Sequence, residues 1–224
     1  MTLAEMLLEL GHIVNDPSLE PSFQDWLNQT IEELAQDFDL PALKRKEPFP
    51  LSTNTATWIY TLPETFHKKL FRCLDGDWRA VTICRTVDEL LAKDFKHLEI
   101  GTRVTHVAVD DAGPVKLIYT YPKANDTLQL WFYEKPNRLA KDGDVPNLMP
   151  VEFHRRVILP RVVLRNFQLL QDMAKDPPHK SLLYWEELYR QGLYGDKRGD
   201  IGLINWLVRA RGGPRRHGGR APLP

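Results

Sequence analysis

The stretch from Leu128 to Leu164 constrains the fold of this chain more than any other. It opens with L-Q-L-W-F-Y-E, whose apolar residues alternate as in a β-strand, and this pattern stops at Pro136. An acidic loop interrupted by prolines follows, and a helix is predicted to start at or just after Pro150. The order indicates a small β module that returns the chain to a helical body, and no catalytic group stands at the junction.

Amphipathic spacing predicts helices on both sides of this module. The expected helices are 2–11, 22–38, 86–95, 151–173 and 180–192. Thr2, Ser22 and Thr86 are the expected N-caps, since a side-chain oxygen there accepts from a free backbone N–H. Pro160 is expected to kink the 151–173 helix or to split it in two, because proline lacks the N–H that a helix interior needs.

The β module is predicted as short strands joined by turn residues. A strand is expected at 58–60, and Asp75-Gly76-Asp77 is expected to form the turn of a hairpin between 71–74 and 81–84. Strands 104–110, 115–121 and 128–134 are expected to form an antiparallel meander. Within the last strand, Leu128, Leu130 and Phe132 should face one way and Gln129, Trp131 and Tyr133 the other.

These patterns together predict the α+β class, with a helical bundle body, an inserted antiparallel β module and an extended C-terminal tail. The expected domains are N-terminal helices over 1–48, a β-rich insertion over 49–140, C-terminal helices over 141–195 and a basic tail over 196–224. The helices at 22–38 and 151–190 are expected to pack together as one body.

The charge of the chain is zero in sum but uneven along its length, with 30 Lys/Arg and 30 Asp/Glu. From Lys197 onward there are seven Lys/Arg against Asp200 alone. An acidic body with a basic tail indicates an interaction arm that seeks a negative surface. We expect no membrane association and no signal peptide, and two cysteines without C-x-x-C spacing favour a reducing setting.

Sequence motifs favour a protein that is not an enzyme. The chain has no phosphate-binding glycine loop, no H-E-x-x-H and no G-x-S-x-G, and we expect no cofactor and no metal. The aromatic residues of the predicted meander have the chemistry to stack nucleobases. Because acidic residues lie near them in the sequence and no basic groove is evident, packing in the core and at subunit interfaces is the preferred interpretation.

The C-terminal segment is the candidate interaction site. An apolar island at 201–208 is followed by arginines, and it is too short to fold alone, so we expect it to be mobile in a free subunit and ordered on a partner. Binding to nucleic-acid phosphate and a disordered end are the alternatives. The candidate docking residues are Ile201, Leu203, Ile204, Trp206, Leu207, Arg209, Arg211, Arg215 and Arg216.

The order of these parts resembles the head-to-tail adaptor (connector) proteins of tailed bacteriophages, particularly the short-tailed kind. The resemblance covers about residues 1–195. It is carried by W-I-Y-T-L-P-E-T-F from Trp58, by L-W-F-Y-E-K-P-N-R-L up to Leu139, and by P-V-E-F-H from Pro150.

The resemblance implies a structural virion protein at the head–tail junction, made in the host cytoplasm. It implies a ring of twelve subunits beneath the portal protein that extends the DNA channel, takes part in DNA ejection and serves as the platform for tail or nozzle proteins. The C-terminal segment would then bind the portal. The rival hypothesis is a nucleic-acid-binding protein that acts through its Arg-rich tail.

Overall fold

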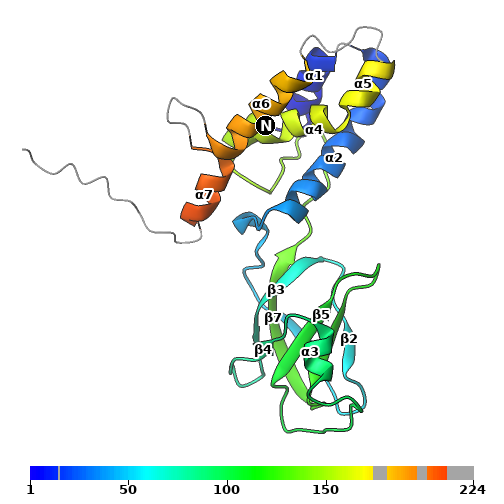
Figure 1. Ribbon diagram of the computed structural model, residues 1–224, viewed down its shortest axis with the longest axis vertical. Helices are drawn as coiled ribbons and strands as arrows, with labels where there is room; N and C mark the ends of the chain where they lie inside the picture. Colours follow the sequence, from blue (N-terminus) through cyan, green and yellow to red (C-terminus); the bar gives the residue numbers. More distant parts are fainter. Residues whose placement is uncertain (15, 174–180, 196–200, 211–224) are drawn as a thin grey trace, which may run out of the picture. The chain divides into compact units, whose positions relative to one another are not determined.

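The computed structural model describes residues 1–14, 16–173, 181–195 and 201–210. The chain forms two compact units, which we call the helical unit (Met1–Ala42 with Pro136–Pro224) and the β unit (Leu43–Lys135). Figure 1 shows the elements of each, and their helices and sheets confirm the α+β class. The β unit is therefore inserted between the N-terminal helices and the rest of the helical unit in the sequence.

The helical unit consists of α-helices with short 3₁₀ and π segments. Its elements are α1 (Leu3–Val14), a 3₁₀ turn (Pro17–Leu19), α2 (Glu20–Asp37), a 3₁₀ turn (Val151–Phe153), a π segment (His154–Ile158), α4 (Leu159–Arg165), α5 (Phe167–Met173), α6 (Leu182–Tyr194) and α7 (Leu203–Ala210), with a further 3₁₀ turn (Pro41–Leu43) at the boundary between the units. Helices α2, α4 and α6 supply much of its core, with side chains such as Leu27, Ile31, Val162 and Trp185 buried.

The N-terminal helices differ from prediction at their ends. Thr2 caps α1 as expected, since its Oγ1 accepts from the N–H of Glu5 at 3.3 Å. The helix runs on through Gly11 to Val14, because Val14 is buried and continues the apolar face. Ser22 is not a cap: α2 begins at Glu20, directly after a 3₁₀ turn that Asp16 caps by accepting from the N–H of Ser18 at 2.9 Å.

The helix expected over 151–173 is split, but not at Pro160. Pro160 is the second residue of α4 and directly follows the π segment His154–Ile158, so the hydrogen-bond pattern changes from π to α just before it while the helix continues. The break falls at Asn166, which has φ −101° and ψ 9° and whose Nδ2 donates to the carbonyl of Val162 at 2.8 Å. An amide side chain that bonds its own helix backbone competes with the next helical bond.

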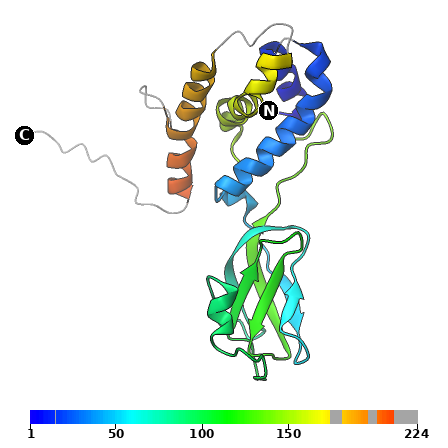
Figure 2. The ribbon, with the colours of Figure 1, turned by 45° about the vertical axis from the view of Figure 1, so that its right-hand side comes forward.

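The β unit contains two sheets that enclose one core (Figure 2). The first has the order β1 (Phe49–Thr53), β7 (Asp126–Glu134), β3 (Phe66–Leu74), and the second β2 (Ile59–Thr61), β6 (Leu117–Tyr121), β5 (His106–Asp110), β4 (Thr82–Ile83). All the strand pairs are antiparallel except β4 with β5. Helix α3 (Val87–Leu91) covers the second sheet, where its Leu90 packs on Ala108, and Thr86 caps it as expected.

The predicted meander is wrong in its last strand. Strands β5 and β6 pair as expected, but β7 leaves them and pairs with β1 and β3 in the other sheet. The physical reason is its apolar face: Leu128, Leu130 and Phe132 are fully buried and form the core between the two sheets. Strands that follow one another in the sequence need not belong to the same sheet, because the core between two packed sheets takes apolar side chains from both.

The predicted hairpin at 71–84 forms only next to its turn, where the N–H of Val81 donates to the carbonyl of Cys73 at 3.0 Å and the N–H of Asp75 to that of Arg79 at 2.9 Å. The Asp75 carboxylate accepts from the N–H groups of Asp77 at 3.0 Å and Arg79 at 2.8 Å, and it pairs with Arg103 at 2.9 Å. After a single bridge between Leu74 and Ala80, the chain leaves β3 and pairs in parallel with β5. The turn therefore carries the chain from one sheet to the other.

Candidate functional site

The apolar island at the C-terminus forms a packed helix in this structure. Residues Leu203–Ala210 are α7, whose side chains Leu203 and Leu207, one turn apart, are buried next to α6. The Trp206 ring lies 5.9 Å from the Phe153 ring, between their centroids. The expectation that this segment cannot bury itself in a free subunit is wrong, because a single amphipathic turn places two leucines on one face.

A close backbone contact holds α7 at its start. A Cβ atom built on Gly202 would lie 2.2 Å from the backbone nitrogen of Gly195, so only glycine fits there. Asn205 adds a hydrogen bond from its Nδ2 to the carbonyl of Tyr194 at 3.2 Å. The glycine of I-G-L is therefore required by backbone packing, which the apolar character of the segment alone does not indicate.

The candidate docking residues separate into four groups. Leu203 and Leu207 are buried within the helical unit, while Ile204 and Trp206 are half-buried. Ile201 and Arg209 are exposed, as is Val208, which sequence reasoning placed in the island without naming it as a docking residue. Arg211, Arg215 and Arg216 lie outside the described residues.

The segment from Pro136 to Phe153, which carries the resemblance, is anchored to the N-terminal helices. Asn28 of α2 accepts from the N–H of Leu139 at 2.8 Å and donates to its carbonyl at 3.0 Å, and Gln24 donates to the same carbonyl at 2.9 Å. Asp144 closes the following loop by accepting from the N–H groups of Ala140 and Lys141. These contacts fix the point at which the chain re-enters the helical unit.

His154 of the P-V-E-F-H motif is a buried packing residue. Its Nδ1 lies 3.2 Å from the Met1 amino group and its Nε2 lies 3.1 Å from the Met149 carbonyl. Because the ammonium donates and the carbonyl accepts, the ring is the neutral Nε2–H tautomer. Burial is the largest cause that lowers the pKa of His154 below its usual value. The ring therefore ties the start of the 151–173 segment to the N-terminus.

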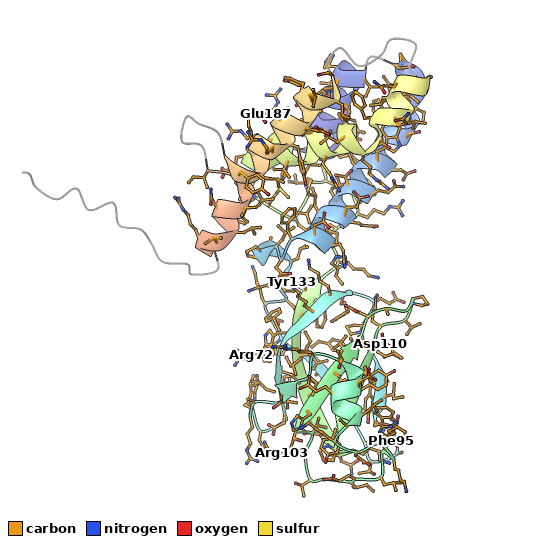
Figure 3. The ribbon with its side chains drawn as sticks, in the orientation of Figure 1. Arg72, Phe95, Arg103, Asp110, Tyr133 and Glu187 are labelled. Carbon is orange, nitrogen blue, oxygen red and sulfur yellow. The ribbon has the colours of Figure 1, made fainter. Side chains whose placement is uncertain are left out.

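The β unit carries a surface that sequence reasoning predicted only in part, since it assigned the aromatic residues of the meander to the core and to subunit interfaces without the cations beside them. We call it the cation–aromatic face, and its members are Lys44, Phe71, Arg72, Trp78, Trp131 and Tyr133. The Arg72 guanidinium lies 4.7 Å from the centroid of the Trp131 ring. The Lys44 ammonium lies 5.3 Å from the Phe71 centroid and 5.8 Å from that of Tyr133. Figure 3 labels Arg72 and Tyr133 on this unit.

Two features of this face bear on function. Trp78 is 62% exposed and Phe71 40% exposed, which is unusual for side chains of their size. Within the described part of the chain, neither Lys44 nor Arg72 forms an ion pair with a carboxylate. The signal was present in the sequence as F-R at 71–72, but it has meaning only once β3 is known to pair with β7.

The described residues offer little for chemistry. No three His, Cys, Asp or Glu side chains among them converge as metal ligands do, and none of the helices they form is long and apolar enough to cross a bilayer. Burial, with Asp126 and Asp75 nearby, raises the pKa of the Cys73 thiol to about 12, so it is protonated and a poor nucleophile.

Comparison with protein families gives a match over most of the chain. Residues 1–213 match the family model described as SU10 adaptor protein, which spans both units and includes α7. A comparison with curated proteins found no match. The match agrees with the resemblance carried by residues 58–66 and 128–157, and it extends it through the C-terminal helix. The chain therefore belongs to the SU10 adaptor protein family, and it is a structural adaptor protein of a phage.

Proposed function

We propose that this chain assembles as a ring of twelve subunits beneath the portal protein. The ring extends the DNA channel, so that packaged DNA passes through it during ejection, and it carries tail or nozzle proteins on its other side. The protein is made in the host cytoplasm and ends at the head–tail junction of the virion. The observation that carries this proposal is the family match over residues 1–213.

We further propose that the C-terminal segment attaches the ring to the portal. Because Leu203 and Leu207 hold α7 on the helical unit, the docking surface consists of Val208 and Arg209, which are exposed on α7, and of Ile201, which is exposed just before it, together with the arginines that follow. Their guanidinium groups suit carboxylates on a partner. Twelve such contacts make a firm joint even when each alone is weak.

The test compares variants of the full chain for attachment to purified portal rings by electron microscopy. Truncation after Ala210 keeps α7 and removes Arg211, Arg215 and Arg216, and we expect it to lower portal occupancy strongly. Val208→Glu should do the same from the exposed side of α7. Leu183→Glu is the matched control, since Leu183 is 74% exposed on α6 and outside the proposed surface.

Two outcomes distinguish portal docking from the rival hypothesis of nucleic-acid binding. If the truncated chain decorates portals at full occupancy, the docking role of the segment is wrong. If truncation instead abolishes binding to duplex DNA, with a steep dependence on salt, the Arg-rich tail is a nucleic-acid-binding arm. Circular dichroism of each variant confirms that the fold is kept.

A further inference from the structure

The cation–aromatic face has the composition of a protein-binding surface. Arginine and large aromatic side chains carry most of the binding energy in protein interfaces, and Trp78, Phe71 and Arg72 present that chemistry together. Duplex DNA is a less suitable ligand, because phosphate binding depends on a series of cations rather than on exposed tryptophan. We therefore expect its partner to present acidic and apolar side chains together.

The same chain contains such a surface in its helical unit. Residues 1–42 hold nine Asp/Glu and no Lys or Arg. Between α1 and the start of α2 lies a groove of about 590 Å³, with apolar lining from Leu7, Leu8 and Phe23 and acidic lining from Asp16, Glu20 and Asp142. Leu8 is 65% exposed. We call this the α1 groove.

The two surfaces are complementary in charge and in apolar content. Glu20 and Asp142, like Lys44 and Arg72, form no ion pair within the described residues. Each surface also exposes a large apolar side chain, Leu8 on one and Trp78 on the other. Because the formal net charge of the chain is zero, two copies do not repel each other as whole molecules.

We propose that the cation–aromatic face of one subunit binds the α1 groove of the next. The occupant of each surface is thus a second copy of this chain. Since each copy has one of each surface, the contact is heterologous and repeats from subunit to subunit, which is what a closed ring needs. This inference rests on the proposed ring and names the surfaces that form it.

The experiment mixes two single-cysteine variants of the full chain, Trp78→Cys and Leu8→Cys, under mild oxidation. A disulfide between the two introduced thiols is measured by mass spectrometry, with Val115→Cys in place of Trp78→Cys as the control. Val115 is 55% exposed in the β unit and outside the face, and the native Cys73 and Cys84 are buried. We expect at least about tenfold more cross-linking than in the control pair.

Charge exchange makes the test specific. Arg72→Glu on the first partner should lower cross-linking about tenfold, and Glu20→Arg on the second should restore it. Cross-linking equal to the control, or dominated by pairs of two Trp78→Cys chains, overturns the inference. The inference is also overturned if truncation after Ala210 abolishes cross-linking, because the C-terminal segment would then be the occupant of the groove. It is likewise overturned if a short DNA duplex competes with cross-linking. Portal attachment is measured separately, so failure here leaves the proposed adaptor role standing.

Discussion

At the scale of single residues, the fold depends on a few buried polar groups that bind backbone. Asn28 is 5% exposed, and its amide satisfies both the N–H and the carbonyl of Leu139. A buried backbone group that loses its partner cannot turn to water, so its desolvation is left uncompensated. Residues of this kind hold the chain where it re-enters the helical unit, although nothing in the sequence pattern distinguishes Asn28 from the surface amides of α2.

We expect Asn28→Ala to lower the free energy of unfolding by about 2 kcal/mol, because the N–H of Leu139 loses its partner and its carbonyl keeps only the bond from Gln24. Asn28→Asp keeps the acceptor and should cost less. Glu32→Ala, on the exposed side of the same helix, is the control and should change stability by less than about 0.5 kcal/mol. Urea denaturation measures all three, and an Asn28→Ala variant as stable as the control would contradict this account.

His154 makes stability depend on pH. Burial, the largest cause, lowers its pKa in the folded protein below the usual 6.5, so the unfolded chain binds the proton more readily. The contribution of this ring is therefore fully present above about pH 6.5 and is lost as the pH falls below it. We expect His154→Gln to be less stable at pH 8 and to lose less stability between pH 8 and 5.5 than the parent chain.

The slope of stability against pH is what tests this prediction, because a purely structural loss would shift the whole curve without changing its slope. His106 in the β unit titrates in the same sense, since burial lowers its pKa too, so the comparison must be made between variants. Equal slopes for His154→Gln and the parent would show that His154 is not the titrating group.

At the scale of elements, α7 depends on one glycine. A Cβ on Gly202 would lie 2.2 Å from the Gly195 nitrogen and 2.4 Å from the Leu193 carbonyl oxygen, and backbone atoms cannot move aside as a side chain does. We expect Gly202→Ala to detach α7 and to speed amide hydrogen exchange in residues 203–210 by at least about tenfold. Gly11→Ala, where nothing lies within 4 Å, should instead be neutral or stabilising by about 1 kcal/mol.

The elements also show how far the sequence determines the fold. Helices were predictable where apolar residues recur at helical spacing, as in Phe23, Leu27 and Ile31, and caps where a hydroxyl faces the first turn. The assignment of strands to sheets was not predictable. The alternation of apolar and polar residues fixes which side of β7 is buried, but not which strands lie beside it. The break at Asn166 was not predicted for a related reason. The effect of Pro160 on a helix follows from its residue type alone, whereas Asn166 breaks the helix only because its side-chain amide contacts the Val162 carbonyl.

The candidate site was predictable only in part. The composition of 201–208 indicated a segment that needs to bury apolar surface, and α7 does so, but on its own helical unit rather than on a partner alone. The cation–aromatic face escaped because Phe71, Arg72 and Trp131 lie in strands whose pairing no local pattern indicates. Both cases are failures to predict long-range contacts, which local spacing does not encode.

At the scale of the whole molecule, the chain consists of two units with separate cores. The β unit has its own buried cluster, which includes Phe66, Leu130 and Phe132, and the helical unit has another around α2 and α4. Unfolding of such a chain need not be two-state, since each core can be lost without the other. The unit boundaries also indicate where a deletion should be tolerated: Leu139 is fully buried in the helical unit, so a replacement that extends past Leu139 removes part of that core.

We therefore expect two transitions in hydrogen-exchange or denaturant experiments, one for each unit. Leu27→Ala should lower the stability of the helical unit, and Leu130→Ala that of the β unit, by about 2–5 kcal/mol each, because both side chains are fully buried. Each change should leave the peptides of the other unit largely unaffected.

Replacing residues 43–135 by a short linker should leave a helical chain by circular dichroism. Replacing 50–140 should give a weaker helical signal, since Leu139 is then lost. If Leu130→Ala lowers protection equally in α2 and in β7, the two units fold as one cooperative body and the insertion is not independent.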